Sequence, residues 1–565
     1  AAIRGYQGSG PGLTPGHVFA TAKHFAAHGP NEGGINTAPT QVPERELREE
    51  LLWPFERAVR EGQVAAVMPS YNEIDGVPST ASPFLLDRVL RGEWEFRGLV
   101  VSDYNAIEQL VDRHRIADTM PQAARLALTA GVDLELPDRR AYLTLVDQIR
   151  GGNGLEEHLL DLAVARMLRL KFLAGLFDHP YADAEEAERV TNTADAQALA
   201  LDAARASLIL LQNDGGLPLN RSRLKTLAVV GPNAAEIHLG GYSEDPGRGV
   251  SILQGIRDKA GAVKVVFAEG CRITEGPADW NRNEVIPGDP LKNAQRIAAA
   301  VTLARTADAI VAVVGTNEST SREAWADNHL GDAATLDLIS QQDELIRKLV
   351  ATGRPVILVL ENGRPVAITN VMNGVKAVLE VWYPGQEGGT AVAEALFGDI
   401  NPAGKLPISV PRTVGQLPVY YNRKPTSFRN YLFESREPLF PFGHGLSYTT
   451  FRLDDLTLAD RTIGPDGRTA MSVRVTNTGT RRGDEVVQMY VHDLIGSITR
   501  PVKQLRGFAR VSLDPGESTV VKLPIGPEAL WLIDQKMARI VEPGDFDILV
   551  GTSSATTLKA TLTVK

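Results

Sequence analysis

Short apolar runs alternate with longer amphipathic segments over residues 1–176. The runs have the length of buried strands: Val18–Lys23, Val64–Pro69, Gly98–Ser102 and Gly131–Leu136. Apolar residues at helical spacing mark the segments that follow them: Glu44–Glu61, Pro83–Trp94, Ile107–Val111, Gln122–Ala130 and Leu159–Leu176. Strands that alternate with helices predict βαβ units and a parallel sheet.

Polar side chains cluster where these strands should end: Lys23 and His24, Ser70 to Asn72, Asp103, and Asp133 with Glu135. In a (β/α)₈ barrel the carboxyl ends of the strands carry the catalytic groups, so this distribution predicts such a barrel. A closed barrel needs eight strands and about 250 residues, whereas we predict four strands here. Either the sheet is open, or half of a barrel lies outside this chain.

A second alternating region follows a polar segment without apolar periodicity, which we interpret as a linker. Its predicted strands are continuous apolar runs: Thr226–Gly231, Val263–Phe267, Ala309–Gly315, Pro355–Glu361 and Lys376–Val381. Its predicted helices are Asp195–Leu210, Asn293–Thr306 and Leu336–Ala351. Strands that are apolar at every position are typical of a parallel sheet covered on both faces, so this region should form an α/β sandwich.

The last region has the period of two residues that half-buried strands require. Met471, Val473 and Val475 alternate with polar residues, and turn signals such as Asp514-Pro515-Gly516 recur. This pattern predicts a β-sandwich of about 100 residues. The predicted domains are a partial barrel (1–177), a linker (178–197), an α/β sandwich (198–411), a connecting segment (412–452) and a fibronectin-III-like sandwich (453–565).

Composition and charge narrow the function. The chain has 565 residues, of which 43% are hydrophobic and 23% charged, as in ordinary folded proteins. Its net charge of −10 disfavours nucleic acid and anionic membranes as partners. A single cysteine, Cys271, excludes an internal disulfide and a cysteine-based zinc cluster, and the histidines form no His-x-x-x-His pair. No apolar run approaches the roughly 18 residues of a membrane span. We expect no metal, no cofactor, no nucleic-acid partner and no membrane insertion.

Familiar catalytic motifs are missing. The sequence has no G-x-S-x-G elbow, no P-loop and no G-x-G-x-x-G after a strand. Carboxylates are therefore the natural catalysts that remain. Asp, Lys, His and Tyr side chains at strand ends suit sugar chemistry, because hydroxyls need polar partners and glycosidic cleavage needs two carboxyl groups.

Several long motifs resemble family 3 of the glycoside hydrolases. In the first region they are KHF (23–25), YNEIDGVPST (71–80), VVSDYNAIEQL and AGVDLELP (130–137). Further along they are LPLN, VVGPNA, ENGRPVAI, WYPGQEGGTAVAEALFGDINPAGKLPISVP and LFPFGHGLSYTTF. The segment SREAWADNHLGD (321–332) looks most like bacterial β-glucosidases and β-xylosidases. The resemblance covers essentially the whole chain and implies a barrel, an α/β sandwich and a fibronectin-III-like domain.

The resemblance implies roles for residues of the first region. Asp103 matches the nucleophile that forms a covalent glycosyl-enzyme, although an aspartate there can also simply cap the next helix. Tyr104 stands where relatives often have Trp and would alter the pocket wall. Lys23 and His24 match a pair that binds sugar hydroxyls, the alternative being a strand-end pair satisfied by carboxylates. Tyr71 matches an aromatic beside the nucleophile, unless it is only part of the core.

The acid/base of this family comes from a loop of the α/β domain. Here that loop follows Ala309–Gly315 and holds Glu318 and Glu323. Thr316 occupies a position where many relatives have Glu, and Glu323 best matches the family acid, so we expect Glu323 rather than Glu318. A retaining mechanism needs the two carboxyl groups about 5–5.5 Å apart. Trp325 would stack on the sugar or anchor the loop.

The expected activity is that of a retaining, exo-acting β-glucosidase, with β-xylosidase or dual specificity as the alternative. A β-N-acetylglucosaminidase fits less well, because HFAAHGPNEGG lacks the full His-Gly pattern of that group. The substrate would be a β-linked oligosaccharide or an aryl glucoside. Relatives carry upstream barrel strands that grip the sugar. If those strands are absent, we expect a non-catalytic carbohydrate-binding subunit. If a second chain supplies them, or if they were lost through processing or cloning, we expect an enzyme; a homodimer is the other assembly considered. The family is often periplasmic or secreted, but the sequence leaves the cytoplasm open.

Overall fold

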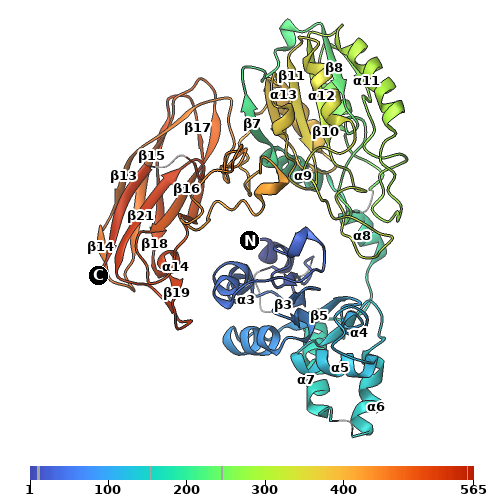
Figure 1. Ribbon diagram of the computed structural model, residues 1–565, viewed down its shortest axis with the longest axis vertical. Coiled ribbons are helices and arrows are strands. Elements are labelled where there is room, and N and C mark those ends of the chain that lie inside the picture. Colours follow the sequence, from blue (N-terminus) through green and yellow to red (C-terminus); the bar gives the residue numbers. More distant parts are fainter. Residues whose placement is uncertain (9–12, 15, 153, 244–245, 556–557) are drawn as a thin grey trace. The chain divides into compact units, whose positions relative to one another are not determined.

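The computed structural model describes residues 1–8, 13–14, 16–152, 154–243, 246–555 and 558–565 (Figure 1). The chain divides into two compact units, Ala1–Val190 and Thr191–Lys565, and we describe each by itself. No helix in the described ranges is long and apolar enough to cross a bilayer.

The first unit is built on a parallel sheet in the order β1-β2-β5-β6. Its strands are Thr21–Phe25, Ala66–Pro69, Leu99–Tyr104 and Leu134–Leu136, close to the four predicted. Parallel pairing aligns Ala22 with Val67, and Val67 with Val100, so the carboxyl ends of the strands share one edge. A small hairpin of β3 (Glu73–Ile74) and β4 (Val77–Pro78), which we did not predict, follows β2.

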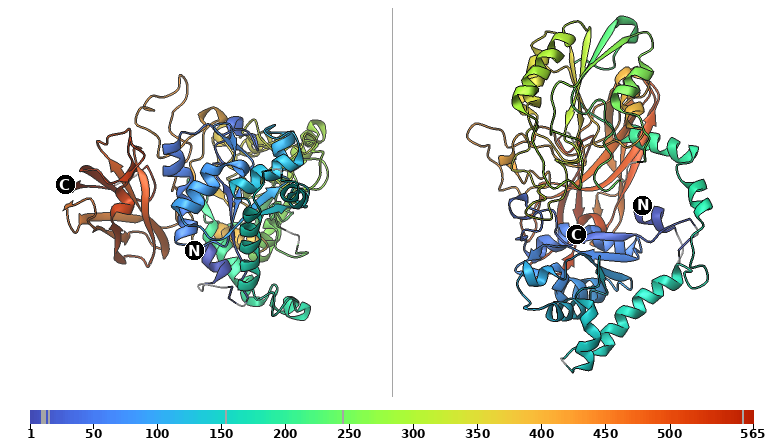
Figure 2. Two further views of the ribbon diagram at one scale, coloured as in Figure 1. Left: turned by 90° about the horizontal axis from the view of Figure 1, so that it is seen from below. Right: turned by 90° about the vertical axis from the view of Figure 1, so that its right-hand side faces the viewer.

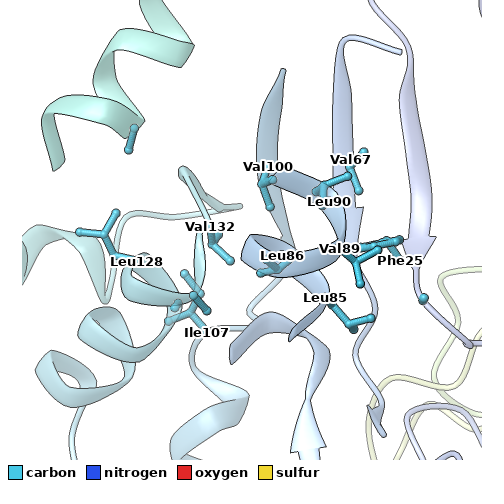
Figure 3. Close-up of a cluster of buried hydrophobic side chains, with 14 of the residues drawn as sticks. Phe25, Val67, Leu85, Leu86, Val89, Leu90, Val100, Ile107, Leu128 and Val132 are labelled. Atoms are coloured by element: carbon cyan, nitrogen blue, oxygen red, sulfur yellow. The ribbon is translucent and has the colours of Figure 1, made fainter. Parts of the chain in front are cut away.

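Helices pack on this sheet through one large apolar core, and a smaller cluster around Ala66, Leu99 and Val101 lies apart from it. Figure 3 shows Phe25, Val67 and Val100 from β1, β2 and β5 beside Leu86 and Val89. The predicted helix Glu44–Glu61 consists of α2 (Glu44–Glu46), a π-helical turn (Leu47–Leu51) and α3 (Trp53–Arg60), and the segment Phe84–Glu93 is also π-helical. The remaining helices are α1 (Ala2–Gln7), α4 (Gln109–Asp112), α5 (Met120–Ala130), α6 (Leu145–Arg150), the long α7 (Glu157–Leu173; teal in Figure 2) and α8 (Ala184–Val190).

The second unit begins with a six-stranded sheet in the order β7-β12-β11-β10-β8-β9. The strands are β7 (Ile209–Asn213), β8 (Thr226–Val230), β9 (Lys264–Ala268), β10 (Ala309–Gly315), β11 (Val356–Glu361) and β12 (Ala377–Glu380). β7 runs antiparallel to β12, and the other pairs are parallel.

Alternate residues of each strand pack into two separate cores, as the continuous apolar runs predicted. Figure 1 shows the helices that flank this sheet. Val311 and Val313 of β10 pack with the layer of α9, α10 and α13, whereas Ile310 and Ala312 pack with α11 and α12. These helices span Ala194–Ser207 (α9), Ile252–Lys259 (α10), Pro290–Ala304 (α11), Gln342–Val350 (α12) and Gly388–Phe397 (α13).

Two helix boundaries and one helix differ from the prediction. The predicted helix Asp195–Leu210 ends at Ser207, and the apolar residues after it form β7, because they pair with β12 far along the chain. The predicted helix Leu336–Ala351 begins only at Gln342. The segment predicted as a linker contains α8, whose residues are all exposed, so no apolar periodicity marked it.

The C-terminal region is a sandwich of two sheets, β13-β15-β18 and β14-β22-β21-β16-β17. The strands are Phe451–Leu458, Thr462–Ile463, Thr469–Asn477, Gly483–Asp493, Gln504–Leu513, Ser518–Ile525, Gly544–Gly551 and Leu558–Val564, for β13 to β18, β21 and β22. Short β19 (Leu532–Ile533), β20 (Arg539–Ile540) and α14 (Pro527–Leu530) lie between them. Met471, Val473 and Val475 are buried in its core, as their alternation predicted.

Candidate active site

Asp103 lies at the carboxyl end of β5 with its carboxylate held from three sides. Oδ1 accepts hydrogen bonds from the Tyr104 backbone N–H (2.7 Å) and from Tyr71 Oη (3.0 Å). His24 Nε2, at the end of β1, lies 3.2 Å from Oδ2. The alternative that Asp103 caps a helix is wrong, because Asp103 belongs to β5 and α4 begins only at Gln109.

These contacts set the charge of Asp103. Burial alone would raise the pKa of its carboxyl group, but His24, the Tyr104 N–H and Tyr71 stabilise the ionised form and leave that pKa below its ordinary value of 3.8. The side chain is 11% exposed. Asp103 is therefore an ionised carboxylate in a largely buried setting at neutral pH, which is the state a nucleophile requires.

The other residues predicted around Asp103 differ in exposure. Tyr71 follows β2 and bonds Asp103, so it is more than a core residue. The contact of His24 with Asp103 is compatible with both roles predicted for that histidine. Lys23 is exposed on β1, and Tyr104 is 57% exposed at the end of β5, so its ring is available as a wall.

A second group of side chains supports this site, and no motif in the sequence indicated it. His114 contacts Glu73 Oε2 through Nδ1 and the Tyr71 carbonyl through Nε2, both at 3.0 Å, and so holds the Tyr71 segment. The partners of His114 are more than 40 residues away in sequence, and no local pattern links them.

Asp133 and Glu135, the carboxylates at the next strand, have structural partners. Asp133 accepts from Arg91 (2.8 Å), Arg166 (2.7 Å) and the Val100 N–H (2.8 Å). Glu135 accepts from two backbone N–H groups after β6. The fold itself supplies hydrogen-bond partners to both carboxylates, which indicates a structural role for them.

In the second unit, the loop with the predicted acid/base begins at Gly315. A Cβ at Gly315 would lie 1.9 Å from the Glu361 carbonyl oxygen, so only glycine allows β10 to end so close to β11. Arg322 then fixes the loop, because its guanidinium donates to the carbonyls of Leu330 (2.8 Å), Trp280 (3.1 Å) and Asn283 (3.1 Å).

Glu323 follows this anchor and accepts a hydrogen bond from Tyr242 Oη at 2.6 Å. The Tyr242 ring packs on Trp280, with ring centroids 5.0 Å apart. Gly241 permits this packing, because a Cβ there would lie 1.5 Å from the Trp280 ring. Trp325 stacks on His329 with centroids 3.3 Å apart and stays 41% exposed, so it anchors the loop and still presents part of its surface.

Glu318 occupies a different environment. Its carboxylate accepts from His238 Nδ1 (2.7 Å) and the Leu239 N–H (3.0 Å). Burial raises the pKa of Glu318, but the His238 hydrogen bond and charge outweigh burial and leave it lowered. Burial lowers the pKa of His238, but the hydrogen bond to Glu318 and the nearby carboxylates, Glu361 and Glu318 foremost, outweigh burial and raise it to about 9. Glu318 is thus an ionised partner of a protonated histidine, which is a poor state for a general acid.

Comparison with known proteins shows to which family the chain belongs. The glycosyl hydrolase family 3 N-terminal domain matches residues 1–170 and the glycosyl hydrolase family 3 C-terminal domain matches residues 208–448. A fibronectin type III-like domain matches residues 485–554. A β-xylosidase of Formosa agariphila is 42% identical over 100% of this chain and 78% of its own length. The chain belongs to glycoside hydrolase family 3.

Other family members support the same assignment. The periplasmic β-glucosidase of Salmonella typhimurium is 39% identical over 95% of this chain and 72% of its own length. The structure of a β-glucosidase from Erythrobacter marinus aligns with a TM-score of 0.97 at 42% identity, covering 100% of this chain and 76% of that chain. The predicted family, glycoside hydrolase activity and fold class are confirmed.

Among the described residues, no group of three His, Cys, Asp or Glu side chains could hold a metal ion. Tyr242, like His114, was not predicted from the sequence, because it lies 81 residues before Glu323 and no local motif links the two residues.

Proposed function

We propose that the chain is a retaining β-glucosidase that uses Asp103 as nucleophile and Glu323 as acid/base. The observation that carries this proposal is the ionised Asp103 carboxylate, with Oδ1 fixed by Tyr71 and the Tyr104 N–H at a strand end. The β-glucosidase structures similar to this chain include one from Listeria innocua in complex with glucose, 32% identical with a TM-score of 0.89.

In the proposed reaction, Asp103 attacks the anomeric carbon while Glu323 gives its proton to the leaving oxygen. A covalent glucosyl-enzyme forms and the alcohol departs. Glu323 then takes a proton from water, which attacks the anomeric carbon, releases β-glucose and restores Asp103. The Tyr242 hydroxyl fixes the direction of the Glu323 carboxyl through its hydrogen bond.

Exposed side chains beside these carboxylates are proposed to contact the sugar. His24 and Lys23 would bind hydroxyls, and the exposed rings of Tyr104 and Trp325 would form apolar walls. The substrate in this proposal is a β-linked oligosaccharide or an aryl β-glucoside.

Turnover of 4-nitrophenyl β-D-glucoside, followed by NMR, tests the proposal. We expect β-glucose to appear before its α anomer, and no turnover in Asp103→Asn. Asp138→Asn is the matched control, because that side chain is 67% exposed and lies just after β6. Equal rates in wild type and Asp103→Asn would refute the nucleophile. Substrate binding without turnover in the wild type would instead favour a non-catalytic carbohydrate-binding subunit.

β-Xylosidase activity is the second candidate, because the 42% identical relative from Formosa agariphila is a β-xylosidase. The two sugars differ in the C6 hydroxymethyl group, and a pocket built to hydrogen-bond a hydroxyl strongly rejects the analogue that lacks it. The ratio of kcat/KM for 4-nitrophenyl β-glucoside and β-xyloside decides between them. A ratio near one would indicate dual specificity.

Association with a further chain is also part of the proposal. β1 and β6 are the two edge strands of the sheet that carries Asp103, and edge strands are free to pair with added strands. A homodimer or a second polypeptide that extends this sheet would complete the walls of the site. Light scattering on the purified chain gives the mass of the assembly. A monomer with full activity would show that no further chain is required.

A further inference from the structure

A pocket of about 350 Å³ lies in the second unit between the connecting segment and the β-sandwich. Figure 1 shows this segment as the orange coil that leads from the α/β sheet to the sandwich. None of the residues predicted for catalysis lines the pocket. Its lining includes Tyr420, Arg423, Arg429, Tyr431, Arg436 and Lys503.

The floor of the pocket is fixed by the fold. The Tyr421 ring stacks on Phe442 with centroids 4.2 Å apart, and its hydroxyl accepts from the Leu505 N–H at 3.1 Å. Gln416 Nε2 donates to the Ser435 carbonyl at 2.7 Å, and the Val502 N–H donates to the Arg423 carbonyl at 3.0 Å. The connecting segment is thereby tied to itself and to the sandwich, so the pocket is formed before any ligand arrives.

The charge of the pocket is strongly positive in a chain whose net charge is −10. Four cationic side chains line it, and Glu437 is the one acidic side chain among the described lining residues. The Arg436 Nε lies 3.0 Å from Glu437 Oε1, and an Arg423 nitrogen lies 3.8 Å from the same oxygen. Glu437 is 61% exposed, so one partly solvated carboxylate faces several cations.

Burial and the excess of positive charge lower the pKa of two of these cationic side chains, Lys503 and Arg423. Burial lowers the pKa of Lys503, and the positive charge of Arg423 lowers it further. Burial and Arg436 likewise lower the pKa of Arg423. A bound anion would oppose both effects, because it stabilises the charged forms of the two side chains.

The rim of the pocket is aromatic. Tyr420 is 55% and Tyr431 is 52% exposed. A tyrosine offers an apolar ring face and a hydroxyl, which match the C–H face and the hydroxyl rim of a pyranose. Arginine adds a planar fork of donors that suits carboxylate and sulfate groups.

We propose that this pocket binds an acidic saccharide unit, meaning a sugar that carries a carboxylate or a sulfate group. The anionic group would lie among Arg423, Arg436 and Lys503, with the ring against Tyr420 or Tyr431. Arg429 would add charge at the mouth, where its guanidinium lies 5.0 Å from the Phe428 ring centroid. The site would hold an acidic glycan chain on the enzyme without taking part in the cleavage.

Isothermal titration calorimetry on the full chain carrying Asp103→Asn tests the proposal without turnover. The probes are methyl β-D-glucuronide and glucose 6-sulfate, with methyl β-D-glucoside and inorganic sulfate as controls. We expect at least one acidic sugar to bind more tightly than both controls, and this binding to weaken as NaCl rises from about 0.05 to about 0.5 M. The glucuronide and the sulfate ester distinguish the two anionic groups, and binding of either supports the proposal.

Variants assign this binding to the pocket. Arg429→Gln should weaken binding of the acidic sugar about fivefold, Lys503→Met should abolish it, and Lys503→Arg should retain it. Arg452→Gln is the matched control, because that arginine is 63% exposed on β13 and pairs with Asp454. Binding that is unchanged in Arg429→Gln and Lys503→Met, or inorganic sulfate binding as tightly as the sugars, would overturn the proposal. In a chain with Asp103 intact, Arg429→Gln should leave aryl glucoside turnover unchanged. A failure of the acidic-sugar proposal can therefore be distinguished from a failure of the proposed β-glucosidase function.

Discussion

Tyr71 Oη donates a hydrogen bond to Oδ1 of Asp103 at 3.0 Å, across the carboxyl ends of two neighbouring strands. This bond, together with the Tyr104 N–H, fixes one oxygen of the carboxylate and favours its ionised form. The pairing of β2 with β5 determines this arrangement, because it aligns Val67 with Val100 and so sets the two strand ends side by side.

Removal of that hydroxyl should weaken the nucleophile. A hydrogen bond to a charged group is worth about 1.5–3 kcal/mol, so Tyr71→Phe should lower kcat/KM for an aryl β-glucoside about 10- to 100-fold. The pKa of Asp103 should rise, and the acidic limb of the pH profile of kcat/KM should move to higher pH with it. An unmoved acidic limb would mean that Tyr71 does not act through the charge of Asp103.

The hydrogen bond from Tyr242 to Glu323 predicts a leaving-group effect. Tyr242→Phe leaves the ring on Trp280 but removes the 2.6 Å bond, so Glu323 should be less well directed. We expect kcat/KM, which reports the first step, to fall about tenfold for an alkyl glucoside, whose departure needs a proton, and to change little for 2,4-dinitrophenyl β-glucoside. Equal loss with both substrates would indicate a structural role for Tyr242 instead.

The His238–Glu318 pair predicts a stability effect that depends on pH. The pKa of His238 is raised to about 9 from its ordinary 6.5, so its contribution is complete below about pH 6.5 and disappears as the pH rises through about 9. The pKa of Glu318 is lowered, so its contribution is present above its ordinary 4.5 and is lost as the pH falls through the lowered value.

Denaturant unfolding of Glu318→Gln at several pH values measures this effect. The variant should be less stable than wild type by about 2 kcal/mol near pH 6, and the difference should shrink towards pH 9. Glu323→Gln serves as the control. Glu323 lies on the same loop as Glu318, but its carboxylate accepts a hydrogen bond from Tyr242. A difference that grows with rising pH would contradict the assigned protonation of the pair.

The buried carboxylate of Asp133 predicts a loss of stability without a role in the chemistry. Asp133→Ala leaves Arg91 and Arg166 without their shared partner, and breaking a buried ion pair costs about 3–5 kcal/mol. The thermal transition of the first unit should fall accordingly, whereas Asp138→Ala, at an exposed side chain, should change stability by less than about 0.5 kcal/mol. Equal stability of the two variants would refute the structural role of Asp133.

Local patterns were sufficient to locate the strand ends of the first unit but not the contacts between them. Asp103 was predictable, because a short apolar run followed by a polar residue marks the carboxyl end of a buried strand. The supports of the site come from distant segments: His114 contacts Glu73 and Tyr71 from more than 40 residues away. Such contacts depend on how the helices pack on the sheet. Packing between distant segments produces no periodic pattern of residues that could be recognised in the sequence.

The errors in the second unit have the same origin. The apolar residues after Ser207 suit a helix or a strand equally well, and antiparallel pairing of β7 with β12 decides for the strand. Family resemblance, rather than spacing, favoured Glu323 over Glu318, and that choice stays a prediction. The partners that distinguish the two carboxylates, His238 and Tyr242, precede the loop by about 80 residues. Long-range partners, rather than local propensity, give these two carboxylates their different surroundings.

Chemical rescue by azide tests most directly whether Asp103 is the nucleophile and Glu323 the acid/base. Azide should restore turnover of 2,4-dinitrophenyl β-glucoside by Asp103→Gly and yield α-glucosyl azide, because azide then attacks in place of the missing carboxylate. With Glu323→Ala the same experiment should yield β-glucosyl azide, formed from the glucosyl-enzyme. β-Glucosyl azide from Asp103→Gly, or no azide product from either folded variant, would contradict the account.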